Sequence, residues 1–229
     1  MIIDIHCHTR YGSSCSFMSP EEMLHQAVEV GLDGICITEH DINWERDAIK
    51  QLSDRFGILV IGGIEVSTEY GEVLVFGLNK PILDVQDIHE LRRRVDKDGG
   101  VMVAAHPFRG AHGFVKVDPE KGFIIKLEEA LKLPIFEVVD AAEVFNGMAS
   151  EWELDLCSAV CDSLQIGGMA GSDAHNVGQV GDCVTVLQNM VASEEEFLHE
   201  LTHGRYHAWH RIRNLTFPNM EADRLMAGR

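Results

Sequence analysis

The sequence of 229 residues is poor in basic side chains: 19 lysines and arginines stand against 37 aspartates and glutamates, a formal net charge of −18. Nucleic acids and anionic membranes are bound through positive protein surfaces, so this balance disfavours both as partners. It leaves room for a small phosphorylated substrate, because bound metal ions can invert the sign of a local field.

Long apolar runs and targeting signals are missing as well. No run reaches membrane-spanning length, and the N-terminus lacks the basic segment and apolar core of a signal peptide. The six cysteines are scattered and form neither a disulfide framework nor a Cys-x-x-Cys pair. We therefore expect a cytoplasmic protein without a membrane partner. The sequence leaves the oligomeric state open.

Linkers, internal repeats and low-complexity segments are also absent from the sequence. With 45% apolar and 24% charged residues, the composition is that of an ordinary globular protein. We expect one domain over residues 1–210, followed by a tail or short helix at 211–229.

Apolar runs alternate with amphipathic segments along the chain. In the segment 19–31, Ser19 is an N-cap, Pro20 opens a helix, Glu22 completes a capping box and Gly31 ends it. Similar patterns predict further helices at 43–57, 84–100, 127–133, 150–164 and 193–204. The apolar runs predict strands at 2–8, 33–40, 58–67, 72–78, 101–106, about 138–145, 166–175, 183–187 and 205–210.

This alternation predicts a largely parallel sheet covered by helices, either an open sheet or a barrel. Periodicity alone does not separate the two architectures. Residues 107–122 carry no legible pattern. Both architectures place ligand sites at the carboxyl ends of the parallel strands, so polar residues at those ends indicate a site more firmly than they indicate closure.

Potential metal ligands follow five of the predicted strands. His6 and His8 lie two residues apart at the end of the first strand, so both project from one face. The other candidates are imidazoles and carboxylates at later strand ends, namely His40, Glu65, His106, Asp173 and His175. Each of these residues alone could be a cap, a turn residue or a satisfied core histidine. Together, at the same end of five strands, they predict a metal site.

Four segments that carry these residues resemble the blocks of the polymerase and histidinol phosphatase (PHP) family. They are "DIHCHT", "TEHD", "AAHP" and "GSDAH", in that order, and the resemblance extends from residue 4 to about residue 176. It implies a distorted seven-stranded β/α barrel with two or three metal ions on its carboxyl-terminal face.

The same resemblance implies how the ligands are shared. His6, His8, Glu65 and Asp173 would hold a first ion. Glu65 would bridge to a second ion, which His106 would also bind.

His40 and His175 would hold a third ion, and here the chain departs from the family pattern. Family members often carry an Asp or His five residues after the second histidine, where this chain has Ser13. They also often carry a His shortly after the bridging Glu, where the nearest candidate is Glu72. Cys15 is a further substitute ligand, although a loop thiol is the simpler interpretation.

Five more residues are candidates for supporting roles. Asp4 lies on the His6 face of the strand and is expected to orient an imidazole. Arg109 could hold a phosphate with its planar fork or form a surface salt bridge, and Arg10 is a weaker candidate for the same role. His112 could be a general acid or a solvent-exposed residue, and Asn146 could contact substrate or cap the next helix.

The ligand types predict zinc, manganese or iron rather than calcium or magnesium, which prefer all-oxygen shells. Two or three such ions would activate a metal-bound hydroxide against a phosphoester. The leading hypothesis is therefore a metal-dependent phosphoesterase for a small phosphorylated metabolite or nucleotide.

Two alternatives remain open. The association of the family with polymerases suggests a 3′–5′ exonuclease-like activity on nucleic-acid ends, which the net charge of −18 disfavours. The departures at Ser13 and Glu72 allow a metal-binding regulatory module without turnover.

Overall fold

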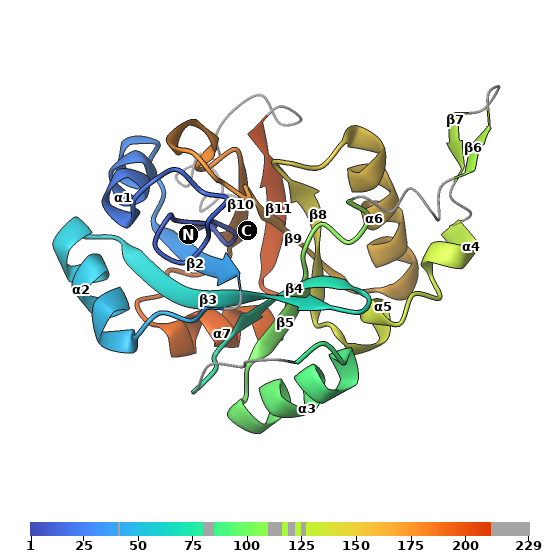
Figure 1. Ribbon diagram of the computed structural model, residues 1–229, viewed down its shortest axis with the longest axis horizontal. Helices are drawn as coiled ribbons and strands as arrows, with labels where there is room; N and C mark the ends of the chain where they lie inside the picture. The colour runs from blue at the N-terminus through green and yellow to red at the C-terminus, as the bar shows by residue number, and fades with distance from the viewer. Residues whose placement is uncertain (41, 80–84, 110–115, 119–121, 125–126, 212–229) are drawn as a thin grey trace, which may run out of the picture.

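The computed structural model describes residues 1–40, 42–79, 85–109, 116–118, 122–124 and 127–211 (Figure 1). They form a mixed α/β fold around a nearly closed, barrel-shaped sheet with the strand order β11-β10-β1-β2-β3-β4-β5-β8-β9. The strands are β1 (Ile2–Asp4), β2 (Gly34–His40), β3 (Leu59–Thr68), β4 (Gly71–Phe76), β5 (Val101–Ala104), β8 (Ala141–Asn146), β9 (Gly167–Gly171), β10 (Cys183–Leu187) and β11 (Tyr206–His210). A separate hairpin consists of β6 (Lys116–Asp118) and β7 (Gly122–Ile124).

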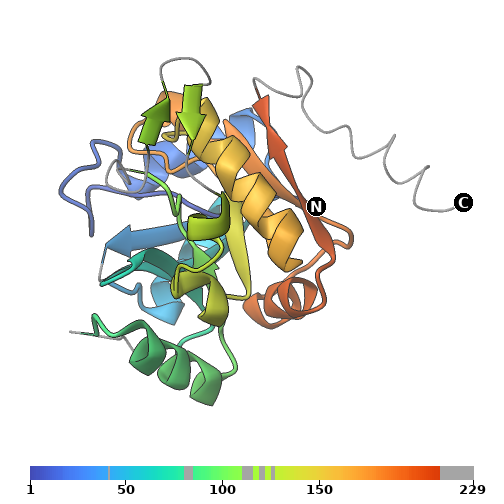
Figure 2. The ribbon, with the colours of Figure 1, turned by 90° about the vertical axis from the view of Figure 1, so that its right-hand side faces the viewer.

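The helices surround this sheet, with α1 and α2 on one flank, α3 and α7 below and α6 on the opposite flank (Figures 1 and 2). They are α1 (Pro20–Glu29), α2 (Arg46–Phe56), α3 (Ile88–Asp98), α4 (Leu127–Ala130), α5 (Ile135–Val138), α6 (Glu151–Leu164) and α7 (Glu194–Thr202), with a short 3₁₀ turn at Val177–Gln179. Within the described ranges, no helix has the length and apolar character needed to cross a membrane.

Most of the strands run in one direction. The pairs β1–β2, β2–β3, β5–β8 and β8–β9 are parallel, whereas β4 and β10 run antiparallel to both of their neighbours. The carboxyl ends of β1, β2, β3, β5, β8 and β9 therefore meet along one edge, which we call the carboxyl rim.

The interior face of the barrel changes character along each strand. Alternate residues point inward, and on β3 these are Ile61, Gly63 and Glu65, running from an apolar residue to a carboxylate at the rim. The opposite end is apolar, where Phe197 of α7 packs edge-on against Phe76 with ring centroids 5.4 Å apart. The barrel is therefore plugged by hydrophobic side chains at one end and polar at the other.

The two ends of the sheet approach each other beside the rim through single hydrogen bonds rather than through a continuous strand pairing. The Thr185 hydroxyl of β10 donates to the Ala170 carbonyl of β9 and accepts from the Ala170 amide. Beyond the end of β1, Cys7 forms a bridge to Ala174. These contacts bring the segment after β9 beside the segment after β1, where the chain carries histidines and an aspartate.

The barrel that the family resemblance implies is confirmed, but its strand number differs: among the described residues the sheet has nine strands rather than seven. The antiparallel strands β4 and β10 interrupt the parallel order of a repeating β/α barrel. The strand predicted around 138–145 begins at Ala141, because residues 135–138 form a helical turn. The unpatterned segment 107–122 contributes β6 to a hairpin that stands away from the body in Figure 1.

Candidate metal centre

Imidazoles and carboxylates from distant parts of the chain converge at the carboxyl rim. Among the described residues, four groups of three potential ligands have donor atoms within 4.8 Å of one another, and all four lie in this cluster. The groups are His6–His8–Glu65, His6–His106–Asp173, His40–Glu65–Glu72 and His8–His40–His175. The structure thus brings together all seven residues that the sequence predicts as ligands, together with Glu72.

The innermost part of the cluster, the inner set, consists of His6, His8, Glu65 and Asp173, all of which are buried. The Nε2 atoms of the two histidines lie 3.0 Å apart. Glu65 Oε2 lies 3.4 Å from His6 Nε2 and 3.2 Å from His8 Nε2. Asp173 Oδ1 lies 3.5 Å and 3.2 Å from the same two nitrogens.

Glu143 determines which nitrogen of the neutral His6 ring carries the hydrogen. Its Nδ1 lies 3.0 Å from Glu143 Oε1, and a carboxylate oxygen only accepts, so Nδ1 carries a hydrogen. The other carboxylate oxygen of Glu143 accepts from the His106 amide and from Asn146 Nδ2. In the neutral ring, His6 therefore presents the lone pair of Nε2 to the centre of the cluster.

A hydroxyl relay does the same for His8. The Ser13 hydroxyl donates to Glu39 Oε2 over 2.6 Å, so its oxygen accepts from His8 Nδ1 at 3.1 Å. Glu39 is itself fully buried and accepts further hydrogen bonds from Thr9 and from the Trp44 indole. The neutral His8 ring then also presents its Nε2 lone pair to the centre.

The inner set fits a divalent cation. Glu65 Oε2 and Asp173 Oδ1 are buried oxygens without a hydrogen-bond donor, and uncompensated buried charge is strongly unfavourable. His40 Nδ1 lies 3.0 Å from the same Glu65 oxygen, without the alignment of a hydrogen bond. The five separations that involve an imidazole nitrogen run from 3.0 to 3.5 Å. A tetrahedral ion with bonds of about 2.0–2.1 Å requires ligand separations of about 3.3 Å.

A second group of donors, the outer set, surrounds His106 Nε2. Glu65 Oε1 lies 3.1 Å away, so the two oxygens of Glu65 face different parts of the cluster. Glu72 Oε2 and Asp173 Oδ2 each lie 3.7 Å from His106 Nε2. Arg109 contacts these same two oxygens: its NH1 group donates to Asp173 Oδ2, and its NH2 group lies 3.6 Å from Glu72 Oε2.

The third group consists of histidines nearer the surface. The rings of His40 and His175 lie 4.5 and 4.6 Å from the His8 ring. His175 Nδ1 donates to the Asp173 carbonyl over 2.8 Å, which leaves Nε2 free to bind. The Ser13 hydroxyl is engaged by His8 and Glu39, so it offers no ligand that replaces the Asp or His of the family pattern.

Electrostatic effects in the cluster favour ionised carboxylates. Burial alone would raise the pKa of Glu65, but the charge of His6 and contacts with His106 and His40 hold that pKa well below its usual range. Burial also acts to raise the pKa of Asp173. The charge of His6, the contact with His8 and the neighbouring Arg109 hold it far below normal instead.

Two of the imidazoles respond in the opposite sense, whereas burial lowers the pKa of His175. Burial alone would lower the pKa of His6, but Glu143, Asp173 and Glu65 raise it well above the usual value. Contact with Glu65 raises the pKa of His40 against the effect of burial. In the absence of a metal ion, protons on His6 and His40 would therefore offset part of the charge of the carboxylates.

Unusual backbone conformations support two of these residues. His106 and Asp173 have positive φ angles of 28° and 52°, a region that residues other than glycine seldom adopt. Gly171 is required by space: a Cβ there would lie 2.5 Å from His6 Cβ and 2.6 Å from Glu143 Oε1. The chain thus carries local strain and close approach where the ligands converge.

The supporting residues proposed from the sequence take several different places. Asp4 does not orient an imidazole: its carboxylate accepts from the amides of His6, Ser172 and Gly181, because β1 ends at Asp4 and the chain leaves the regular strand there. Asn146 does not cap α6. It is fully buried and donates to Glu143, whereas Ser150 is the N-cap.

The remaining candidates lie at the edge of the cluster or beyond it. Arg109 belongs to it, with a side chain 33% exposed. Arg10 approaches Glu22 at 4.0 Å, and its side chain is 61% exposed. Cys15 is exposed. His112 lies outside the described residues.

Sequence reasoning missed the two carboxylates that hold the histidines. Glu39 lies in the quoted block "TEHD", and Glu143 lies in the strand "AAEVFN". The signal that drew attention to Glu65, an acidic residue within an apolar strand, is present at both positions. Only the distances show that Glu65 faces the Nε2 atoms at the centre, that Glu143 faces His6 Nδ1 and that Glu39 accepts from the Ser13 hydroxyl.

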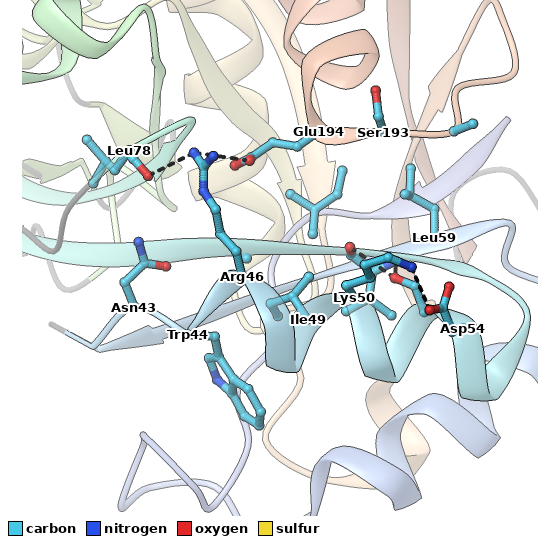
Figure 3. Close-up of a pocket in the computed structure, with 15 residues that line it drawn as sticks. Asn43, Trp44, Arg46, Ile49, Lys50, Asp54, Leu59, Leu78, Ser193 and Glu194 are labelled. Carbon is cyan, nitrogen blue, oxygen red and sulfur yellow. Dashed lines mark hydrogen bonds and ion pairs between the residues drawn. The ribbon is translucent and has the colours of Figure 1, made fainter.

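A cavity of about 330 Å³ lies elsewhere, between α2, the start of β3 and the beginning of α7 (Figure 3). We call it the far hollow, because Leu59 at the opposite end of β3 from Glu65 lines it. Its charges are already paired: Arg46 lies 3.8 Å from Glu194, and Lys50 lies 2.6 Å from Asp54. No histidine of the cluster lines it, so it is a separate feature.

The comparisons with known proteins agree with this geometry. Residues 4–118, half of the chain, match the family model described as PHP domain, and residues 152–206 match the model described as PHP-associated. The first match includes every cluster residue from His6 to Arg109.

Individual relatives match over parts of their length. An uncharacterised protein of Methanocaldococcus jannaschii is 28% identical over 47% of this chain and 68% of its own length. The 5′–3′ exoribonuclease Rnm of Salmonella typhimurium is 35% identical, but the match covers 34% of this chain and 28% of that protein.

The fold also has relatives among solved structures. One is a two-domain protein of Bacteroides vulgatus, described as containing a predicted PHP-like metal-dependent phosphoesterase. It is 20% identical with a TM-score of 0.69, over 92% of this chain and 64% of the other. A match over half of the sequence, on a barrel whose rim gathers the family's histidines and carboxylates, leads to one conclusion: the chain belongs to the PHP domain family.

Proposed function

We propose that the protein is a metal-dependent phosphoesterase that hydrolyses a small phosphorylated metabolite or nucleotide. The observation that carries the proposal is the inner set. Two imidazole nitrogens with lone pairs and two buried carboxylate oxygens without donors face one another at 3.0–3.5 Å. A divalent cation would use both nitrogen lone pairs and neutralise both carboxylates.

The proposed ligands follow from the distances. His6, His8, Glu65 Oε2 and Asp173 Oδ1 would hold one ion. Glu65 Oε1 and His106, with Glu72 beside them, would hold a second.

His40 and His175, next to His8, would hold a third ion. Mixed nitrogen and oxygen donors favour zinc, manganese or iron. Divalent ions at these positions supply Lewis acidity toward a phosphoryl group and acidify water.

The protein's own side chains prepare that chemistry. Glu143 and the Ser13–Glu39 relay fix the two inner rings with their Nδ1 hydrogens turned outward. This arrangement keeps the Nε2 lone pairs available and raises ligand basicity. Because Glu65 uses both oxygens, it sets the spacing between the inner and outer sets.

Arg109 is the proposed phosphate-binding side chain. Its guanidinium lies at the rim in contact with Asp173 and Glu72, and it is one-third exposed. A planar fork with several N–H donors matches two oxygens of a phosphate. It would orient the phosphoryl group over the outer set.

Direct evidence for the function would come from a panel of phosphomonoesters and phosphodiesters assayed with the metal-loaded protein. Asp173→Ala removes an inner carboxylate and should abolish hydrolysis while the protein remains folded by circular dichroism. Full activity in the purified, metal-loaded variant would refute the proposal.

The two alternatives have their own tests. Rates on a single-stranded oligonucleotide and on mononucleotides separate an exonuclease from a phosphatase. The similarity to the 5′–3′ exoribonuclease Rnm favours testing RNA as well as DNA. Stoichiometric metal without hydrolysis across the panel would indicate a regulatory module.

A further inference from the structure

The inner and outer sets differ in whether a positively charged side chain of the protein contacts their carboxylate oxygens. In the inner set, Glu65 Oε2 and Asp173 Oδ1 are buried and have no donor. In the outer set, Glu72 Oε2 and Asp173 Oδ2 both face the guanidinium of Arg109. A side-chain cation therefore already occupies the neighbourhood of the outer donors.

The position of Arg109 across the outer set is specific. The two oxygens that it contacts are the ones that lie 3.7 Å from His106 Nε2. An ion bound between His106, Glu65 Oε1 and Glu72 must draw Glu72 away from the guanidinium or displace it. The inner oxygens make no contact with Arg109, because its NH1 group engages the opposite oxygen of Asp173.

Exposure adds to the contrast. The side chains of Glu65 and Asp173 are fully buried, whereas that of Glu72 is 31% exposed. A buried donor set gains more from a cation than a partly solvated one, because screening by water is weaker there. The inner set has four ligands and two buried carboxylate oxygens without a donor. In the outer set, Glu72 is partly solvated and Arg109 already contacts two of the carboxylate oxygens.

We propose that Arg109 is a built-in competitor for the outer metal site, so that the inner ion binds first and tightly and the outer ion exchanges. Binding of an ion at the outer site requires Arg109 to lose its contact with Glu72. The phosphate of a bound substrate can then pair with the guanidinium in place of Glu72. Occupancy of the outer site would then be linked to substrate binding.

This inference depends on the metal centre of the proposed function but not on hydrolysis. The test is a calorimetric titration of the metal-free full-length chain with Mn²⁺, followed in parallel by electron paramagnetic resonance, which detects coupling between neighbouring Mn²⁺ ions. In the wild type, we expect the first step, at the inner set, to be at least about tenfold tighter than the second, at the outer set.

Arg109→Gln removes the competing charge and frees both carboxylate oxygens. Its second step should tighten by about tenfold, while the first changes by less than about threefold. Arg55→Gln is the matched control, because it removes one positive charge from a side chain that is 64% exposed and pairs with Glu21 outside the cluster. Both of its steps should equal those of the wild type.

Arg109→Lys keeps the charge without the fork and serves if the glutamine variant does not fold. Its second step should also tighten, by a smaller factor. Equal affinities for two ions in the wild type would overturn the inference, as would a wild-type second step in both Arg109 variants. If the two-step pattern holds and the phosphoester panel shows no hydrolysis, the proposed function fails while this inference stands.

Discussion

The carboxyl rim and the far hollow both gather charged residues, but the charges are paired in the hollow and partly unpaired at the rim. In the far hollow, Arg46, Lys50 and Asp54 have side chains 66–71% exposed, and each contacts an opposite charge. At the rim, Glu65 and Asp173 are fully buried, and one oxygen of each has no donor.

The difference shows how to separate a structural cavity from a site with chemistry. Exposed ion pairs contribute at most about 1 kcal/mol and are easily replaced. Buried uncompensated oxygens are much more unfavourable, so a fold retains them where a cation binds. The presence of a hollow is therefore a weaker guide to a site than unpaired buried charge.

The largest expected difference comes from the same substitution in the two regions. Glu65→Gln removes a charge and one of two oxygens that face separate donors. Phosphoester hydrolysis should fall by about 1,000-fold or more, since several kcal/mol of charge stabilisation are lost. Glu194→Gln in the far hollow, measured by the same steady-state assay, should remain within about twofold of the wild type. Equal losses in both variants would contradict the distinction.

Removal of metal should lower the thermal stability of the wild type more than that of a variant whose rim has lost a ligand. A ligand present at about 1,000 times its dissociation constant stabilises the folded state by about 4 kcal/mol. In a chain of this size, that predicts a fall of about 10 °C in the midpoint of thermal unfolding when a chelator is added. The Glu65→Gln variant should show little change. A chelator-insensitive wild type with full activity would argue against a metal centre.

Two buried glutamates permit a finer comparison. Three donors face the carboxylate of Glu143, and an amide in its place would set N–H groups against N–H groups. Glu143→Gln should weaken metal binding by about 10–100-fold in a calorimetric titration.

Glu200 is the control for that variant, because it is buried and pairs with Arg205 and Asn189 away from the rim. Glu200→Gln should lower the free energy of unfolding by about 1–3 kcal/mol and leave metal affinity unchanged. A weakened metal affinity in Glu200→Gln would mean that the effect of Glu143 is not specific to His6.

The smallest effect concerns a group that should respond to pH but not to metal. Burial raises the pKa of Tyr206, whose hydroxyl packs beside Gly167 at the start of β9, to about 12. The unfolded chain loses this proton near pH 10, so unfolding becomes more favourable as pH rises from about 10 toward 12.

Tyr206→Phe should show a shallower fall of the urea midpoint between pH 9 and 11, with and without chelator. An identical slope in both proteins would show that Tyr206 ionises equally well in the folded state.

Much of the centre could be predicted from the sequence because its ligands follow apolar strands. Glu65 and Asp173 come at the ends of legible runs, and parallel strands bring such ends together. The supporting contacts could not be predicted in this way. The expectation for Asp4 assumed a regular strand to residue 8, whereas the chain leaves β1 after Asp4 and joins the segment at Ala174.

Glu143 illustrates a second limit. In sequence, it is an acid in an apolar strand, as is Glu65. Glu143 faces Nδ1 of His6, whereas Glu65 faces Nε2 of the same ring. That choice depends on a few ångströms set by tertiary packing, which periodicity does not encode. The hairpin after Arg109 has no periodic signal at all.

The most direct test of the whole account is anomalous diffraction from crystals grown with Mn²⁺ or Zn²⁺. The account predicts a strong anomalous peak among His6 Nε2, His8 Nε2, Glu65 Oε2 and Asp173 Oδ1. A map with no peak there, from crystals in which the same ion is bound at other positions, would contradict it.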